Sequence, residues 1–140
     1  CPTRHRSPSE HFIDGESFAV EIHAVHYDCK YDTFEEAAEE KDGLAVLTIF
    51  AEAVPNDNEL LNPLCDLLPN VTKADSKVQL SAREGLQWVG SGIKLNHHYY
   101  TYPGSLTTDP YTENVIFILL PEAITLSCAQ LAAFRRIRGD

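Results

Sequence analysis

The sequence predicts a mainly β (α+β) domain with short peripheral helices, and three observations support this class. Apolar and polar side chains alternate with a period of two over much of the chain, which is typical of strands. Two Asp-Gly dipeptides, Asp14-Gly15 and Asp42-Gly43, precede such stretches and favour tight turns with positive φ angles. Two runs, residues 44–51 and 115–120, are almost continuously apolar, as expected where both faces of a strand are covered.

The first Asp-Gly predicts a hairpin over residues 11–18, because two short arms flank a two-residue turn. The second arm is expected to continue as a strand over residues 18–27. Alternation along this strand places Glu21, His23 and Val25 on the same face.

The remaining elements are shorter. The apolar run at 115–120 is predicted to stop at Pro121, and residues 62–68 are predicted to form a short helix. Ser127 and Gln130 fit a capping box, which predicts a helix from residue 128 through Phe134. An acidic stretch, residues 34–40, is interpreted as an exposed turn of helix or loop with a solvated face.

Composition limits the class of partner. The 140 residues carry a formal net charge of −10 and are 44% hydrophobic, which fits one globular domain over residues 1–140. The negative charge disfavours nucleic acid and anionic membranes as partners. Neither a signal peptide nor a transmembrane segment is recognised in the given residues, so a soluble protein of open compartment is expected.

The cysteines and one modification motif leave the compartment undecided. Cys1, Cys29, Cys65 and Cys128 are widely spaced and form no C-x-x-C pair, so both disulfides and buried thiols stay possible. Asn70-Val71-Thr72 is an N-glycosylation sequon, which has a consequence only in a secretory compartment.

Histidines suggest metal chemistry only weakly when the residues are considered alone. A strand with Glu21 and His23 on one face could orient a metal-binding imidazole, but zinc needs at least three protein ligands. His26 points to the opposite face, so the two histidines are interpreted as one in the core and one at the surface or hydrogen-bonded. His97-His98, beside Tyr99-Tyr100, is interpreted as a polar, aromatic loop.

Three segments nevertheless resemble the α-type carbonic anhydrases when taken together. They are Ser9-Glu10-His11, the E-x-H-x-V-H strand from Glu21 to His26, and the G-S-L-T-T segment from Gly104 to Thr108. The resemblance extends over nearly the whole chain. It implies a twisted, largely antiparallel central sheet with short peripheral helices, of which these residues form part. It also implies zinc-dependent, reversible hydration of carbon dioxide as the activity of the family.

The resemblance assigns roles by position. His23 matches a zinc ligand and Glu21 matches the carboxylate that supports it. Glu10 and Thr107 match the pair that orients the zinc-bound hydroxide, and Phe117 stands where the family has a tryptophan. The positions that match the substrate side of the pocket are Val25, Val46, Leu106 and Thr108.

One departure concerns the other two zinc ligands, which the family takes from an H-x-H pair. No H-x-H occurs in these residues. In one alignment Arg4 and Arg6 occupy the two ligand positions, and a guanidinium cannot bind zinc because it has no free lone pair. In the other alignment the pair lies upstream of Cys1. Both alignments leave His23 as the one family zinc ligand in the sequence.

Three functional hypotheses follow. The first is a non-catalytic carbonic anhydrase-related protein without a metal cofactor, a structural or binding subunit whose incomplete sheet is covered by protein partners. The second is a zinc-dependent carbonate dehydratase, acting on carbon dioxide and bicarbonate, for which this sequence is an incomplete chain. The third is a bicarbonate- or carboxylate-binding module that uses Arg4 and Arg6.

Overall fold

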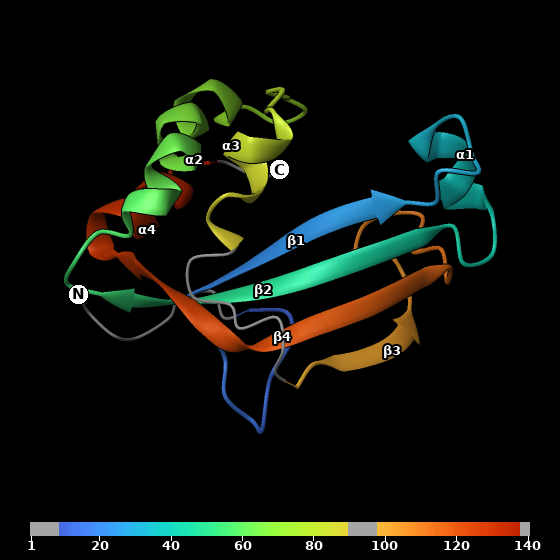
Figure 1. Cartoon of the computed structure of the whole chain (residues 1–140), viewed down its shortest axis with the longest axis horizontal. Coiled ribbons are helices and arrows are strands. Elements are labelled where there is room, and N and C mark those ends of the chain that lie inside the picture. Colours follow the sequence, from blue (N-terminus) through green and yellow to red (C-terminus); the bar gives the residue numbers. More distant parts are fainter. Residues whose placement is uncertain (1–8, 90–97, 138–140) are drawn as a thin grey trace.

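The computed structural model describes residues 9–89 and 98–137 and is built on a four-stranded sheet. Its strands are β1 (Val20–Tyr27), β2 (Leu44–Val54), β3 (Tyr100–Gly104) and β4 (Val115–Ser127). They lie in the order β1-β2-β4-β3 (Figure 1). The β1–β2 and β3–β4 pairs are antiparallel and the β2–β4 pair is parallel. The predicted mainly β class with a largely antiparallel sheet is therefore confirmed.

Short helices surround this sheet. They are α1 (Phe34–Glu39), α2 (Asn62–Leu67), α3 (Ala82–Leu86) and α4 (Cys128–Phe134), with 3₁₀ turns η1 (Glu59–Leu61) and η2 (Leu68–Val71). Helices α2, α3 and α4 gather near one end of the sheet, whereas α1 lies at the other end (Figure 1). None of the helices in the described ranges has the length and apolar character that a membrane span requires.

Alternation along the strands divides the core into two clusters, one on each face. The helix-side cluster is centred on Ile49, Leu61, Trp88, Leu126 and Leu131, and it joins the sheet to the helical layer. The opposite cluster contains Phe18, Leu44, Val46, Phe50, Val115, Phe117 and Leu119. Glu21 and His23 lie opposite Phe50 and Thr48 of β2 in register, so they share the face of the second cluster.

Both predicted Asp-Gly turns form. Asp14 and Gly15 have φ angles of 51° and 82°, and a single bridge joins Ile13 to Glu16, so the hairpin is confirmed but short. Asp42 also has a positive φ, 59°. Gly43 is needed for close packing, because a Cβ there would lie 1.9 Å from the carbonyl oxygen of Ala37.

The prediction that the second apolar run stops at Pro121 is wrong, because β4 continues to Ser127. Leu120 is opposite Ile49, but the next paired residue, Ile124, is opposite Ala51, so β4 advances further than β2 at this point. This irregularity accommodates Pro121, whose missing N–H would interrupt a regular ladder.

The helix predictions are mostly confirmed. The Ser127–Gln130 capping box makes both of its hydrogen bonds, and the helix predicted at 62–68 is α2 followed directly by η2. Helix α3 was not predicted, although Ser81 and Glu84 form a second capping box that could have indicated it. The predicted loop around the tyrosine pair is wrong in part, because Tyr100 begins β3.

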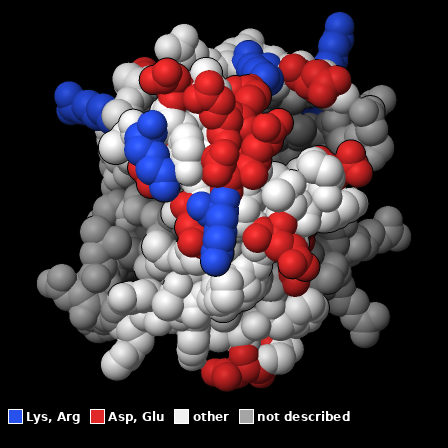
Figure 2. All heavy atoms as spheres, turned by 90° about the vertical axis from the view of Figure 1, so that its right-hand side faces the viewer, with Lys and Arg blue, Asp and Glu red and all other residues white. Residues whose placement is uncertain are grey.

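The acidic stretch at 34–40 forms α1, and its exposed face is confirmed. Its carboxylates, together with that of Asp32, are exposed, whereas Ala37 is fully buried against the sheet. Figure 2 shows that acidic side chains gather on this end of the molecule with few basic ones among them. Such a distribution is typical of a solvated surface.

Candidate functional site

The carboxylate of Glu21 is the centre of the best-defined polar cluster among the described residues. Its Oε1 atom lies 2.5 Å from Nδ1 of His11 and 2.5 Å from Nε2 of His23. Its Oε2 atom accepts the backbone N–H of His11 at 2.9 Å. The Glu21 side chain is only 5% exposed, so three donors converge on a carboxylate that is nearly shielded from water.

These contacts determine which ring nitrogens carry protons. Burial alone would raise the pKa of Glu21, but hydrogen bonds from His23 and His11, with the charge of His11, lower it to about 2. An ionised carboxylate only accepts hydrogen bonds, so both facing nitrogens must be donors. In the neutral His23 ring, the proton on Nε2 leaves a lone pair on Nδ1, which is free to bind a metal ion.

His11 extends the cluster to a second strand. Its Nε2 atom is hydrogen-bonded to the hydroxyl of Tyr102 on β3. The Tyr102 ring stacks on Phe117 with centroids 5.1 Å apart, and Phe117 also meets the edges of the His11 and His23 rings. Gly104 permits this packing, because a Cβ there would lie 3.1 Å from both the Phe117 and the Tyr102 rings.

Tyr102 is itself affected by the cluster. Burial raises the pKa of its phenol, and the negative charges of Glu21 and Glu10 raise it further. The hydroxyl is therefore kept protonated, and its oxygen forms the hydrogen bond with Nε2 of His11. Together the two strands, the hairpin and Phe117 fix the orientation of the His23 ring.

The atoms of His11, Glu21 and His23 that face one another lie within 4.8 Å, close enough to be considered as a metal-binding group. Nitrogen and oxygen ligands of a tetrahedral zinc ion would stand about 3.3 Å apart, given metal–ligand distances of about 2.0–2.1 Å. The observed nitrogen-to-oxygen separations of 2.5 Å are instead those of hydrogen bonds. The cluster therefore holds the His23 ring through hydrogen bonds and does not itself have the geometry of a metal cage.

The positions predicted to form an apolar wall are brought together. Val25 and Val46 are opposite one another on β1 and β2, with Val46 buried and Val25 exposed at 46%. Leu106 packs against the cluster that contains Val46. This arrangement places an apolar surface on the same strand face as His23.

The predicted orienting pair is not joined. Glu10 lies 4.0 Å from Nε2 of His23 and its carboxylate is largely exposed, but no hydrogen bond links it to Thr107 in the described chain. Thr107 and Thr108 are exposed, and Thr108 uses its carbonyl oxygen to accept the N–H of Tyr111.

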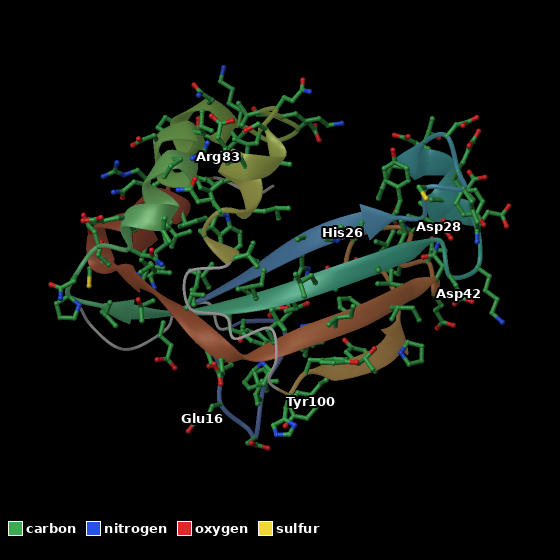
Figure 3. The ribbon with its side chains drawn as sticks, viewed as in Figure 1. Glu16, His26, Asp28, Asp42, Arg83 and Tyr100 are labelled. Carbon is green, nitrogen blue, oxygen red and sulfur yellow. The ribbon has the colours of Figure 1, made fainter. Side chains whose placement is uncertain are left out.

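The other sequence candidates lie apart from this cluster. His26 is exposed and its Nδ1 contacts the carbonyl oxygen of Ala24 at 2.9 Å, toward the α1 end of the sheet (Figure 3). His98 is exposed at the start of the second described range. Arg4, Arg6 and His97 lie outside the described residues.

Comparison with known proteins identifies the family. The family model for eukaryotic-type carbonic anhydrases matches residues 3–140. The chain belongs to this family. It is 42% identical to carbonic anhydrase 7 of Mus musculus over 130 residues, which are 92% of this chain and 47% of that protein.

Two further carbonic anhydrases show similar agreement. Carbonic anhydrase 6 of Mus musculus is 40% identical over 126 residues, covering 89% of this chain and 39% of its own length. The mitochondrial carbonic anhydrase 5A of Rattus norvegicus is 35% identical over 130 residues, covering 92% and 41%. This carbonic anhydrase chain therefore spans less than half the length of each of these relatives.

Two residues of the cluster, His11 and Tyr102, were assigned no role from the sequence. His11 was visible only as the last residue of Ser9-Glu10-His11, and Tyr102 only as part of the tyrosine-rich segment. Their contact spans 91 positions in sequence, which no local pattern reveals. The hairpin before β1 was the available signal, because it turns the chain back toward Glu21.

Proposed function

We propose that this chain forms part of a zinc-dependent carbonic anhydrase that hydrates carbon dioxide to bicarbonate and a proton, with Nδ1 of His23 as one zinc ligand. The observation that carries the proposal is the hydrogen bond from Nε2 of His23 to Glu21. Catalytic zinc sites use histidines whose second ring nitrogen donates to a carboxylate or carbonyl oxygen, because this fixes the tautomer and the ring orientation.

The described residues fit one ligand position of the metal. A catalytic zinc site needs three protein ligands, so two ligands besides His23 are required. Zinc, when bound, supplies a Lewis acid that lowers the pKa of a coordinated water to about 7.

The chain's own residues contribute positioning and an apolar surface. Glu21 holds the His23 ring, and His11 and Tyr102 in turn hold Glu21. Val25 presents an apolar side chain on the strand face of the histidine, backed by the buried Val46 on β2, which suits a substrate without charge or dipole. The loop with Thr107 and Thr108 begins after β3 and carries two hydroxyls at the exposed side of this face.

Zinc content and carbon dioxide hydration of the purified protein test the proposal together. We expect one equivalent of zinc, and hydration measured by stopped flow with a pH indicator. His23→Asn should abolish both, whereas Glu21→Gln should weaken zinc binding about 10- to 100-fold. His26→Asn is the matched control, since His26 lies three residues away on the same strand and, among the described residues, its ring is hydrogen-bonded to a backbone carbonyl alone.

A second candidate is a non-catalytic member of the family that serves as a binding or structural subunit. It is favoured by the sequence, which contains no H-x-H pair, and by the separation of Thr107 from Glu10. A folded protein that binds less than a tenth of an equivalent of zinc, at roughly the uncatalysed hydration rate, would replace the first proposal with this one. Light scattering of that protein should then show an assembly larger than a monomer.

A further inference from the structure

The glycosylation sequon Asn70-Val71-Thr72 lies in a part of the fold that the zinc proposal does not use. Asn70 belongs to η2, the 3₁₀ turn that follows α2. In a 3₁₀ helix side chains three positions apart share a face, so Leu68 and Val71 lie on one side. Leu68 is buried at 6% exposure and Val71 is half-buried, whereas Asn70 between them is exposed. The turn therefore presents the acceptor side chain outward.

The side-chain amide of Asn70 is also not used in the hydrogen bonding of the described fold. It makes no hydrogen bond to any residue in the described part of the chain. Thr72, the third residue of the sequon, instead directs its hydroxyl to the carbonyl oxygen of Pro69 at 3.4 Å. Attaching a large group to Asn70 would consequently break no side-chain hydrogen bond among the described residues. Asn70-Val71-Thr72 is also the single N-x-S/T sequence, with x other than proline, in all 140 residues.

A second, independent observation concerns the compartment. Cys128, the first residue of α4, is disulfide-bonded. Helix α4 contacts both η2 and α2, so Cys128 lies in the same helical layer as the sequon. Disulfides form and persist in the secretory pathway and outside the cell, and they are rare in the cytosol. The sequon and the disulfide thus indicate the same environment.

We propose that Asn70 carries an N-linked glycan, added in the secretory pathway. In the reaction Nδ2 of Asn70 bonds to the anomeric carbon of a lipid-linked oligosaccharide. The bond from that carbon to the lipid pyrophosphate breaks, the pyrophosphate leaves with its electron pair, and Nδ2 loses one proton. No oxidant or reductant is required.

The glycan would not obstruct the candidate zinc site. The helical layer packs on the sheet face that bears Ile49 and Leu126, and Glu21 and His23 are on the other face. Figure 3 shows Arg83, from α3 of the helical layer, on the opposite side of the sheet from Tyr100 and Glu16. A glycan at η2 would instead cover the outer surface of the helical layer and keep it in solution.

The test compares the protein from its native source with the same chain secreted by cultured eukaryotic cells. Both are digested with peptide-N-glycosidase F in heavy-oxygen water, which converts a glycosylated asparagine to labelled aspartate. We expect the label at position 70 in both, and a mobility shift of the secreted chain after digestion. Asn70→Gln and Thr72→Ala should each abolish label and shift.

Two controls separate loss of the glycan from loss of the fold. Thr72→Ser keeps a hydroxyl at the third position and should restore the label. Asn56→Gln, at an exposed asparagine without a sequon, should leave label and shift unchanged. An unlabelled position 70 in the native protein, or in a folded secreted chain, would overturn the proposal, and it would leave the zinc proposal unaffected.

Discussion

The two parts of the predicted catalytic site, the pair Glu21 and His23 and the loop residue Thr107, differ in how they are held. Glu21 and His23 are on a strand, and their positions follow from the register of β1 against β2. Thr107 lies in the loop after β3, is exposed, and makes no hydrogen bond with Glu10 in the described residues. One half is therefore assembled by a sheet within this chain, and the other is carried by a loop.

This difference shows that strand pairing alone can position the side chains of a site. Strand pairing fixes the spacing of side chains on one face, so three donors reach the Glu21 carboxylate from the hairpin and from β1 itself. A loop residue has no such ladder, and its position depends on whatever packs against it. Removing single side chains from each half tests the comparison.

The largest effect is expected from Glu21→Gln. The amide offers one acceptor oxygen and a donor group, so at least one histidine N–H loses its partner inside a shielded cluster. We expect the free energy of unfolding in urea to fall by about 3 kcal/mol. Thr107→Val, the matched change in the loop, should alter it by less than about 0.5 kcal/mol. Equal losses in the two variants would show that the halves are held alike.

The second prediction concerns Asn114, at the end of the loop between β3 and β4. This end of the loop is held more firmly than Thr107. Asn114 is buried, and its amide group donates to the carbonyl oxygens of Ala38 and Glu40 at the end of α1. Asn114→Ala leaves both carbonyls without this donor, and we expect a loss of about 2 kcal/mol in urea. Asn56→Ala, at an exposed asparagine, is the control and should change little.

A small effect from Asn114→Ala would mean that α1 and the start of β4 are held together mainly by apolar contacts such as those of Ala37.

The third prediction measures how far the Glu21 cluster extends. Tyr102→Phe keeps the ring that stacks on Phe117 and removes the hydroxyl that is bonded to His11. We expect a loss of about 1 kcal/mol by urea unfolding, the usual worth of one hydrogen bond. Tyr100→Phe, on the same strand with its ring 52% exposed, should be neutral within about 0.5 kcal/mol. A neutral Tyr102→Phe would place the edge of the cluster at His11.

Local patterns in the sequence predicted most elements of the fold. Asp14-Gly15 and Asp42-Gly43 form their turns because positive φ angles are local properties. The Ser127–Gln130 cap forms because both partners lie within one turn. Pro121 was misjudged because its tolerance depends on an irregularity in the pairing of β4 with β2, which is a relation between distant residues.

The candidate site was predictable to the extent that one strand carries it. Alternation placed Glu21 and His23 on one face, and their hydrogen bond is local. The contributions of His11 and Tyr102 were not predictable in this way, because β3 reaches the hairpin only through the sheet order β1-β2-β4-β3. Sequence patterns indicate which residues are close along the chain, whereas this cluster is completed by residues that are distant in sequence and close in the folded sheet.

The smallest effect is expected in the pH dependence of stability. Burial, followed by the charges of Glu21 and Glu10, raises the pKa of Tyr102 in the folded protein. An unfolded tyrosine ionises near pH 10, so the contribution of Tyr102 is complete below that pH. It is lost as the pH rises through the higher pKa of the folded state. Unfolding free energies of the wild type and Tyr102→Phe should therefore approach one another as the pH rises above about 10.

The cause of this shift can be tested separately. Glu10→Gln removes one of the two charges and should move the ionisation of Tyr102, followed by its ultraviolet absorbance, part of the way back toward the ordinary value. Glu16→Gln, at an exposed hairpin carboxylate, should leave it in place. If the Glu10 and Glu16 variants titrate alike, burial and the charge of Glu21 raise the pKa of Tyr102 without a contribution from Glu10. The charge of Glu10, whose carboxylate lies 4.0 Å from Nε2 of His23, would then have no effect on the Tyr102 hydroxyl. The strand-held cluster would in that case be electrostatically separate from the exposed side of the site.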